Sequence, residues 1–195
     1  MEKTSYAIGM NVAASLRQSG AKDIDCDALC RGVKDVLSGQ PTEISPNEAG
    51  QILKKYFSDL EDSQTKDAIR IGADYLEVNG ERSEVTTLKS GLQYEVLKQG
   101  DGPKPKATDV VRCHYVGTLI DGTEFDSSIR RGTPADFPVN GVIAGWVEAL
   151  QLMPVGSKWK LYIPYQLGYG ARGAGQSIPP YATLIFEVEL LEILK

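Results

Sequence analysis

The first eighty residues place their apolar side chains at the spacing of helices. Ile8, Val12 and Leu16 recur at every fourth position, which predicts a helix over about 5–18. A second apolar stripe predicts another helix over about 25–38, and a glycine follows each of these segments where a helix is expected to end. The amino-terminal part of the chain is therefore predicted to be helical.

A third helix has the clearest start signal in the chain. Ser45 is a good N-cap, Pro46 fits the first helical position, and Glu48 lies where a capping box needs an acidic residue. We predict one helix over 46–79, which at 1.5 Å per residue would be roughly 50 Å long. Its middle, 58–67, is nearly all polar, which is typical of a spacer exposed on all sides.

The pattern changes near residue 85, where short alternating segments and turns begin. In the last segment Phe186, Val188 and Leu190 share one face, as in a half-buried strand. Segment 81–87 is polar and is predicted to be a linker, and one helix is predicted near 146–152. Strands are predicted at 92–99, 109–119, 158–163 and 183–194. Because most connections are short, we expect neighbouring strands to pair antiparallel, giving an α+β domain with a curved antiparallel sheet on a single short helix.

These two patterns predict two domains, a helical one over 1–84 and an α+β one over 85–195. About 60 residues of amphipathic helix without a large aromatic core form a marginal domain. We therefore hypothesise a homodimer through residues 1–57, with the long helix carrying the second domain outward. The alternative is a monomeric three-helix bundle.

Composition and charge exclude several classes of function. Apolar residues make up 42% and charged residues 24% of the chain, as in ordinary globular proteins, and the net charge is −5. Residues 1–84 hold 10 Lys and Arg against 15 Asp and Glu, and residues 85–195 hold the remaining 11 and 11. No basic patch supports nucleic-acid binding. No apolar run reaches the length of about 18 residues that a membrane span needs.

The amino terminus has no secretory signal pattern, so we expect a cytoplasmic protein. A periplasmic or outer-surface protein whose signal peptide had been removed would look the same, and that is the alternative.

A search for catalytic or metal-binding groups finds little. The three cysteines, Cys26, Cys30 and Cys113, are too few for a disulfide framework and are interpreted as small semi-buried thiols. His114 is the only histidine, and the adjacent Cys113 and Tyr115 face the other side of their strand, which favours a structural role for His114. We expect neither a metal nor a cofactor.

Aromatic and branched apolar residues gather instead beside loops and turns. One carboxylate, Asp126, lies among them, and it could also be a turn or cap residue. Trp146 and Tyr169 lie beside glycine-rich turns, which favours a pocket, whereas for Phe186 core and pocket are equally good interpretations. The apolar members are Tyr115, Phe125, Phe137, Val142, Ile143, Trp146, Tyr169, Ile178 and Phe186.

Four motifs with these residues resemble the FKBP peptidyl-prolyl isomerases, in the same order along the chain. They are His114–Leu119, Phe125–Ser128, Val142–Trp146 and Ile178–Leu190, and the resemblance covers about 88–195. The helical amino terminus, with Ser-Tyr-Ala-Ile-Gly at 5–9, is similar to the dimerisation region of bacterial Mip-like FKBPs.

The resemblance implies an enzyme that accelerates cis/trans rotation of X–Pro bonds without covalent chemistry. The uncatalysed barrier is about 18–20 kcal/mol. A twisted amide is less dipolar than a planar one, so a dry apolar pocket favours it over the ground state. Such a site needs aromatic side chains and almost no titrating groups.

The family pattern also assigns a role to each residue of the pocket. Trp146 forms the floor under the proline ring. Tyr169 donates through its hydroxyl and Ile143 through its peptide N–H, while Asp126 lies near the reacting carbonyl and bonds to Tyr115. Ile178 belongs to a loop over the pocket. The walls are Tyr115, Phe125, Val142, Ile143 and Phe186, and Phe137 aligns with a further wall phenylalanine.

Two positions depart from several relatives: Ala174 stands where they carry a histidine, and Tyr181 replaces a polar ring. Both are expected to alter affinity for inhibitors such as FK506 and rapamycin. The expected partners are proline-containing peptides and unfolded or partly folded proteins. A non-catalytic chaperone that uses the pocket only to hold such chains is the rival interpretation.

Overall fold

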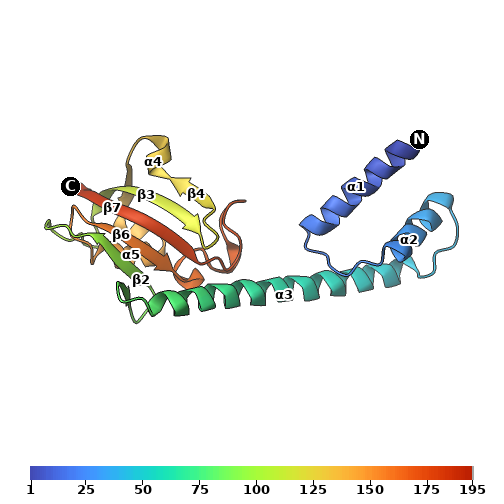
Figure 1. The fold of residues 1–195 in the computed structure, drawn as a ribbon, viewed down its shortest axis with the longest axis horizontal. Helices are drawn as coiled ribbons and strands as arrows, with labels where there is room; N and C mark the ends of the chain where they lie inside the picture. The colour runs from blue at the N-terminus through green and yellow to red at the C-terminus, as the bar shows by residue number, and fades with distance from the viewer. Residues whose placement is uncertain (195) are drawn as a thin grey trace. The chain divides into compact units, whose positions relative to one another are not determined.

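Three helices make up the first part of the chain. The computed structural model describes residues 1–194, and contacts divide the chain into two compact units, Met1–Gln64 and Thr65–Lys195. The helices are α1 (Glu2–Gln18), α2 (Cys26–Ser38) and α3 (Pro46–Gly80), and α3 continues from the first unit into the second (Figure 1). All three predicted helices are confirmed, with ends that differ by at most three residues.

The predicted helix ends have clear local causes. The Asp25 carboxylate accepts hydrogen bonds from the N–H groups of Asp27 and Ala28 at the start of α2, and Gly39 ends that helix with a φ of +67°. At the start of α3, the Ser45 hydroxyl accepts from the Glu48 N–H at 3.2 Å, as its N-cap position predicts.

The first unit buries very little apolar surface. Both α1 and α2 lie wholly within the described chain, and neither contains a buried residue. Their larger apolar side chains are open to solvent, among them Ile8, Val12, Val33 and Leu37. Residues 1–194 do not bury these apolar side chains.

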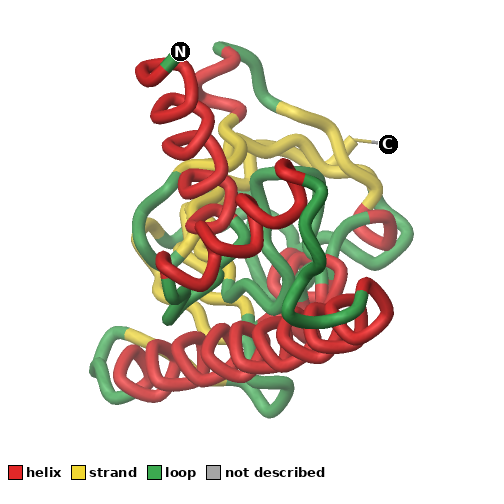
Figure 2. Tube along the Cα trace, turned by 90° about the vertical axis from the view of Figure 1, so that its right-hand side faces the viewer, coloured by secondary structure: helices red, strands yellow, loops and turns green. Residues whose placement is uncertain are grey.

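Seven strands of the described chain form one antiparallel sheet, in the order β1-β2-β6-β7-β3-β4, with β5 paired to β3 (Figures 1 and 2). Strand β3 pairs along its whole length with β7 and also pairs with β4 and β5. The strands are β1 (Val85–Thr87), β2 (Gln93–Lys98), β3 (Val110–Leu119), β4 (Glu124–Ser127), β5 (Ala135–Pro138), β6 (Lys158–Ile163) and β7 (Leu184–Leu194). The predicted fold class, helices followed by an antiparallel sheet on a helix, is confirmed.

Several details of the prediction were wrong. Part of the expected linker is strand β1, in which Val85 pairs with Glu95 of β2. Strands β4 and β5 and the one-turn helix α4 (Ser128–Arg131) were not predicted. Strand β2 pairs with β6 and not with its sequence neighbour β3. These short elements lack apolar alternation, so pairing with the rest of the sheet determines them more than local preference does.

Helix α5 (Ala144–Leu150) packs against one face of the sheet and closes the core. It begins two residues before the predicted helix and buries Trp146, Ala149 and Leu150. On strand β3, alternate residues are buried in the same core: Val111, Cys113 and Tyr115. No described helix is both long enough and apolar enough to span a membrane.

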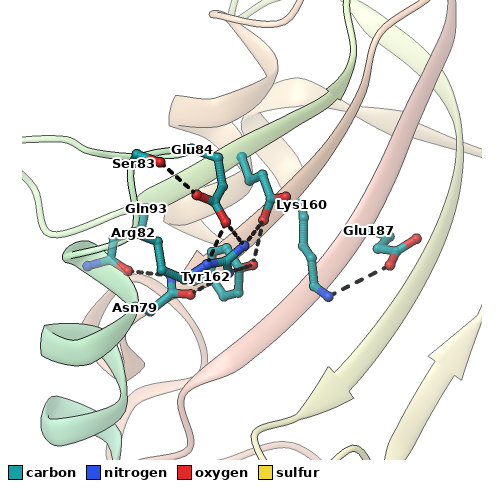
Figure 3. Close-up of polar contacts among 9 residues, drawn as sticks. Asn79, Arg82, Ser83, Glu84, Gln93, Lys160, Tyr162 and Glu187 are labelled. Atoms are coloured by element: carbon teal, nitrogen blue, oxygen red, sulfur yellow. Dashed lines mark hydrogen bonds and ion pairs between the residues drawn. The ribbon is translucent and has the colours of Figure 1, made fainter.

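The end of α3 is tied to the sheet by polar contacts (Figure 3). The buried Asn79 side chain donates to Gln93 Oε1 at 2.8 Å, and Gln93 Nε2 donates to the Leu76 carbonyl at 2.7 Å. Arg82 donates to the hydroxyl of the buried Tyr162 at 3.0 Å and forms an ion pair with Glu95 at the same distance. These contacts join the last turns of α3 to β2 and β6.

Candidate functional site

One cavity of about 740 Å³ lies between the sheet and the start of α5. It brings together all ten residues that the sequence singled out, from β3, β4, β5, β7, α5 and the connecting loops. They are Tyr115, Phe125, Asp126, Phe137, Val142, Ile143, Trp146, Tyr169, Ile178 and Phe186. Three further lining residues were not singled out, Gly141, Gly175 and Ser177, and Ala174, which was expected to alter inhibitor affinity, also lines the cavity.

Trp146 is the centre of an aromatic cluster in this cavity. Its side chain is only 3% exposed, and the rings of Tyr115, Phe137 and Phe186 meet it edge-on, with centroids 5.3–5.5 Å away. Edge-to-face contacts of this kind fix ring orientation in addition to excluding water. The cavity therefore has a rigid apolar base.

Two glycines make this packing possible. A Cβ atom at Gly117 of β3 would lie 2.6 Å from the Phe125 ring and 2.7 Å from the Phe186 ring. A Cβ atom at Gly145 would lie 2.7 Å from a methyl group of Ile163. The absence of a side chain at these two positions lets the rings cover β3 and lets α5 lie directly on β6.

Tyr115 and Asp126, which line the cavity, form a polar triad with Arg131, which lies outside the lining. The Tyr115 hydroxyl donates to Asp126 Oδ2 at 2.5 Å and accepts from Arg131 Nη2 at 2.7 Å. Arg131 also forms an ion pair with Asp126 Oδ1. These contacts hold the Asp126 carboxylate and the Tyr115 hydroxyl in one hydrogen-bonded arrangement.

The triad keeps Asp126 ionised and Tyr115 protonated. Burial acts to raise the pKa of Asp126, but the hydrogen bond from Tyr115 and the pairing with Arg131 together hold that pKa below its ordinary value. Burial and the bond to Asp126 raise the pKa of Tyr115. At neutral pH the triad therefore presents a carboxylate anion whose charge is neutralised by the guanidinium.

Ser128, at the start of α4, fixes the backbone that carries Tyr115. Its hydroxyl accepts from the Tyr115 N–H at 2.7 Å and lies 3.0 Å from His114 Nδ1. His114 does not line the cavity, in keeping with the structural role expected for it.

Two potential donors line the cavity, the Tyr169 hydroxyl and the Ile143 N–H. Tyr169 is 40% exposed, and burial, followed by the Asp126 charge, raises its pKa. The Ile143 carbonyl accepts from the N–H groups of Trp146 and Val147, whereas its own N–H has no acceptor among residues 1–194. A carbonyl group bound in the cavity could accept from either donor.

Ile178 lies on a narrow loop that forms another part of the lining. The loop is closed by two backbone hydrogen bonds between Ala174 and Ile178, at 2.9 and 3.1 Å. Gly173 has a φ of +63°, and a Cβ atom there would collide with the Ile178 carbonyl. Ala174 lines the cavity, whereas Tyr181 does not and instead packs edge-on against Tyr165.

The sequence analysis gave no role to Arg131 and Ser128, which contact the cavity residues Asp126 and Tyr115. Ser128 was quoted within a motif but given no role. Arg131 lies five residues after Asp126, and the one-turn helix α4 brings it back to that carboxylate. Because this helix was not predicted, the sequence did not indicate the contact between Arg131 and Asp126. The two adjacent arginines, Arg130 and Arg131, were the only available signal.

The cavity lining offers apolar contacts and polar groups, but it does not pair a nucleophile with a general base. The single histidine lies outside the cavity, the buried Cys113 is also outside it, and burial raises the pKa of that thiol to about 12. Apolar rings, one paired carboxylate and two donors can bind a small apolar group next to a carbonyl.

Two family models match the chain. A model described as FKBP-type peptidyl-prolyl cis-trans isomerase matches residues 102–191. A second, described as a domain amino terminal to FKBP-type peptidyl-prolyl isomerase, matches residues 1–96. The matches cover both the cavity and the helices.

Relatives and a solved structure agree with these two family matches. The chain is 50% identical over 195 residues to the FKBP-type 22 kDa peptidyl-prolyl cis-trans isomerase of Escherichia coli, covering 98% of this chain and 95% of the relative. It is 44% identical to the FKBP-type isomerase FkpA of Aeromonas hydrophila, covering all of this chain and 76% of the relative. The crystal structure of FkpA from Escherichia coli matches with a TM-score of 0.77 at 36% identity, covering 98% of this chain and 95% of that one. The chain therefore belongs to the FKBP-type peptidyl-prolyl cis-trans isomerases.

Proposed function

We propose that the cavity accelerates X–Pro rotation by non-covalent stabilisation of a twisted amide. The observation that carries this proposal is the rigid aromatic base beside a single charge-neutralised carboxylate. An amide loses dipole as it twists, so transfer from water into such surroundings favours the transition state over the planar ground state. Without enzyme the rotation takes tens to hundreds of seconds.

The proposed roles follow from the positions in the cavity. Trp146 supports the proline ring, and Asp126, Tyr169 and Tyr115 act next to the reacting carbonyl. The Tyr169 hydroxyl and the Ile143 N–H donate to substrate carbonyls. The remaining contacts to substrate come from Phe125, Phe137, Val142, Ile178 and Phe186.

A protease-coupled assay with proline tetrapeptides tests the mechanism. Because the mechanism has no proton transfer, kcat/KM is expected to change little when H₂O is replaced by D₂O. A solvent isotope effect of about twofold or more would point to general acid–base catalysis and contradict the proposal.

The same cavity is proposed to bind FK506- and rapamycin-type macrolides. The apolar base and the two donors are suited to a ring flanked by carbonyl groups. Calorimetry on the full chain should show one binding site per chain, with competition against the tetrapeptide substrate. Binding that leaves isomerase activity unchanged would place the macrolide site elsewhere.

We propose further that residues 1–84 associate two chains and that residues 85–195 carry the isomerase activity. The apolar faces of α1 and α2 support association, because the described part of one chain leaves them unburied. Light scattering should give the mass of a dimer at micromolar concentration. Val12→Asp should shift this mass toward that of the monomer, whereas Gln18→Glu, about 120° away around the same helix, should leave it unchanged. A monomeric wild-type chain would contradict the dimer.

A dimer with two cavities is also proposed to act as a chaperone for unfolded chains. Bivalent binding raises avidity when one client reaches both sites. The full chain should therefore accelerate proline-limited refolding of a protein more than Val12→Asp does, at equal activity on tetrapeptides. Equal refolding by both would remove the need for a dimer.

An exported location is the better proposal for this chain. One relative, 38% identical and covering all of this chain, is named outer membrane protein MIP, from Legionella longbeachae. Nothing in the comparisons supports the cytoplasmic location expected from the sequence. Fractionation of the native organism, with immunodetection of the chain, would decide between the compartments.

A further inference from the structure

We propose that Gly72 of α3 is a positioning residue for the isomerase pocket, acting through Thr183. The inference concerns residues 65–183 of the second unit and rests on the isomerase activity of the family. The last turns of α3 link the two parts of the chain. In this proposal they also hold in place the ends of the segment that carries Tyr169 and Ile178.

The contact between Gly72 and Thr183 is unusually close. Gly72 is buried, and a Cβ atom there would collide with the Thr183 hydroxyl oxygen and lie 3.4 Å from its Cβ atom. Glycine costs a helix about 1 kcal/mol relative to alanine, so its presence inside α3 calls for a reason. The reason visible here is that a bare helix backbone can lie directly on Thr183, which is 5% exposed.

The surrounding groove extends this contact to the loop before the pocket. It has a volume of about 500 Å³ and runs between α3 and the residues that follow β6. Ala73 and Leu76 line it from the helix, and Pro164 and Tyr165 line it from the loop. The helix therefore borders both ends of the segment 164–183.

Within that segment, short contacts lead from the groove to the pocket. Tyr165 packs edge-on against Tyr181, with ring centroids 5.3 Å apart. Tyr181 has a φ of +60°, rare for a residue with a side chain, and its N–H donates to the Gly170 carbonyl at 2.9 Å. Gly170 follows Tyr169, and Tyr181 lies three residues after Ile178. The conformation of both pocket residues is thus linked to the place where Thr183 meets α3.

The end of α3 is also held by the contact of Asn79 with β2, and the chain just after the helix by the contact of Arg82 with β6 (Figure 3). Because Asn79 is about two turns away from Gly72 and Arg82 lies beyond the helix, these contacts hold the helix in place when the Gly72–Thr183 contact alone is altered. A substitution there should consequently move the loop in preference to the helix.

Substitutions that add volume on one side of the Gly72–Thr183 contact and remove it on the other test the proposal in the full chain. Gly72→Ala adds a methyl group to the contact, Thr183→Ala removes atoms from it, and the double variant refills the gap. Each single variant is expected to lower kcat/KM for a tetrapeptide severalfold, since a displacement of about 1 Å near a reacting group can cost up to a hundredfold. The double variant should recover to within about twofold of wild type.

Two further measurements separate positioning from general destabilisation. Amide NMR shifts should change at Tyr169 and Ile178 in the single variants, remain constant at Tyr115 and Asp126, and return in the double variant. Gly50→Ala is the matched control, because Gly50 is also in α3 but has open space around it. That variant should leave both kcat/KM and the pocket shifts unchanged.

Single variants with altered melting temperature but wild-type kcat/KM would overturn the proposal. So would an activity loss that the double variant does not recover. If Gly72→Ala fails to fold, Thr183→Ala and the double variant alone decide, by the same comparison.

Discussion

The hydroxyl of Tyr115 donates to Oδ2 of Asp126 across 2.5 Å, joining the middle of β3 to the end of β4. Charge-assisted hydrogen bonds of this length are stronger than neutral ones. The bond therefore places the Asp126 carboxylate at a fixed distance from the aromatic base of the cavity.

Replacing Asp126 with alanine should lower kcat/KM about tenfold, which corresponds to about 1.4 kcal/mol of transition-state stabilisation. The reason is the loss of a fixed charge next to the reacting carbonyl. A protease-coupled assay measures the effect. Asp136→Ala is the matched control, because Asp136 pairs with Arg112 outside the cavity. Full activity of Asp126→Ala would refute the role proposed for that residue.

Removing the charge of Arg131 should raise the pKa of Asp126. In the native chain this pKa lies below the ordinary value of 3.8, so the stabilisation from the ionised carboxylate is present above pH 3.8 and is lost as pH falls through the lowered pKa. In Arg131→Gln the burial that acts upward remains while the guanidinium is gone. Carboxyl ¹³C NMR titration should give a higher midpoint for Asp126, and stability should be lost at a higher pH. An unchanged midpoint would show that the ion pair has no influence on Asp126.

Trp146→Ala should reduce both stability and substrate binding. Loss of a buried tryptophan typically costs about 3–5 kcal/mol, and the floor of the cavity would be lost as well. Trp159 provides the comparison: it is equally buried but stacks on Tyr94 away from the cavity. Trp159→Ala should lower the melting temperature similarly while macrolide affinity, measured by calorimetry below both transitions, is retained. Equal losses of affinity would count against a specific role for Trp146.

Gly117→Ala should destabilise the chain by about 1–3 kcal/mol, as overpacking in a filled core does. The added methyl group would collide with the rings of Phe125 and Phe186. Urea unfolding measures the loss, and macrolide affinity should fall with it because the two walls must move. Gly122→Ala is an unsuitable control because Gly122 has a positive φ, whereas Gly32→Ala adds a methyl group in a helix with open space.

The sequence was sufficient for the long helices and the central strands. Ser45 and Gly39 mark helix ends by local chemistry, and β3 and β7 alternate clearly between faces, so neighbouring residues contain the necessary information. The pairing of β2 with β6 depends on contacts between residues about 65 positions apart, such as Glu95 and Lys160. Local patterns do not specify such partners.

The ten pocket residues were identified because four motifs with a known family resemblance contain nearly all of them. Arg131 was missed because its contact with Asp126 depends on a helix of a single turn. Gly72 was missed because a glycine inside a helix gives no sign of what it faces. In both cases the function of the residue depends on a neighbour that only the folded chain supplies.

The pairing of β3 with β7 has a consequence for how the protein folds during its synthesis on the ribosome. Tyr115 lies opposite Val188, and the Phe186 wall of the cavity also comes from β7, the last strand of the described chain. The helices can form as soon as their own residues emerge, since their hydrogen bonds are local. The cavity, by contrast, cannot exist until β7 has been translated and has closed beside β3, so each new molecule becomes able to act on proline bonds only after that strand has been made.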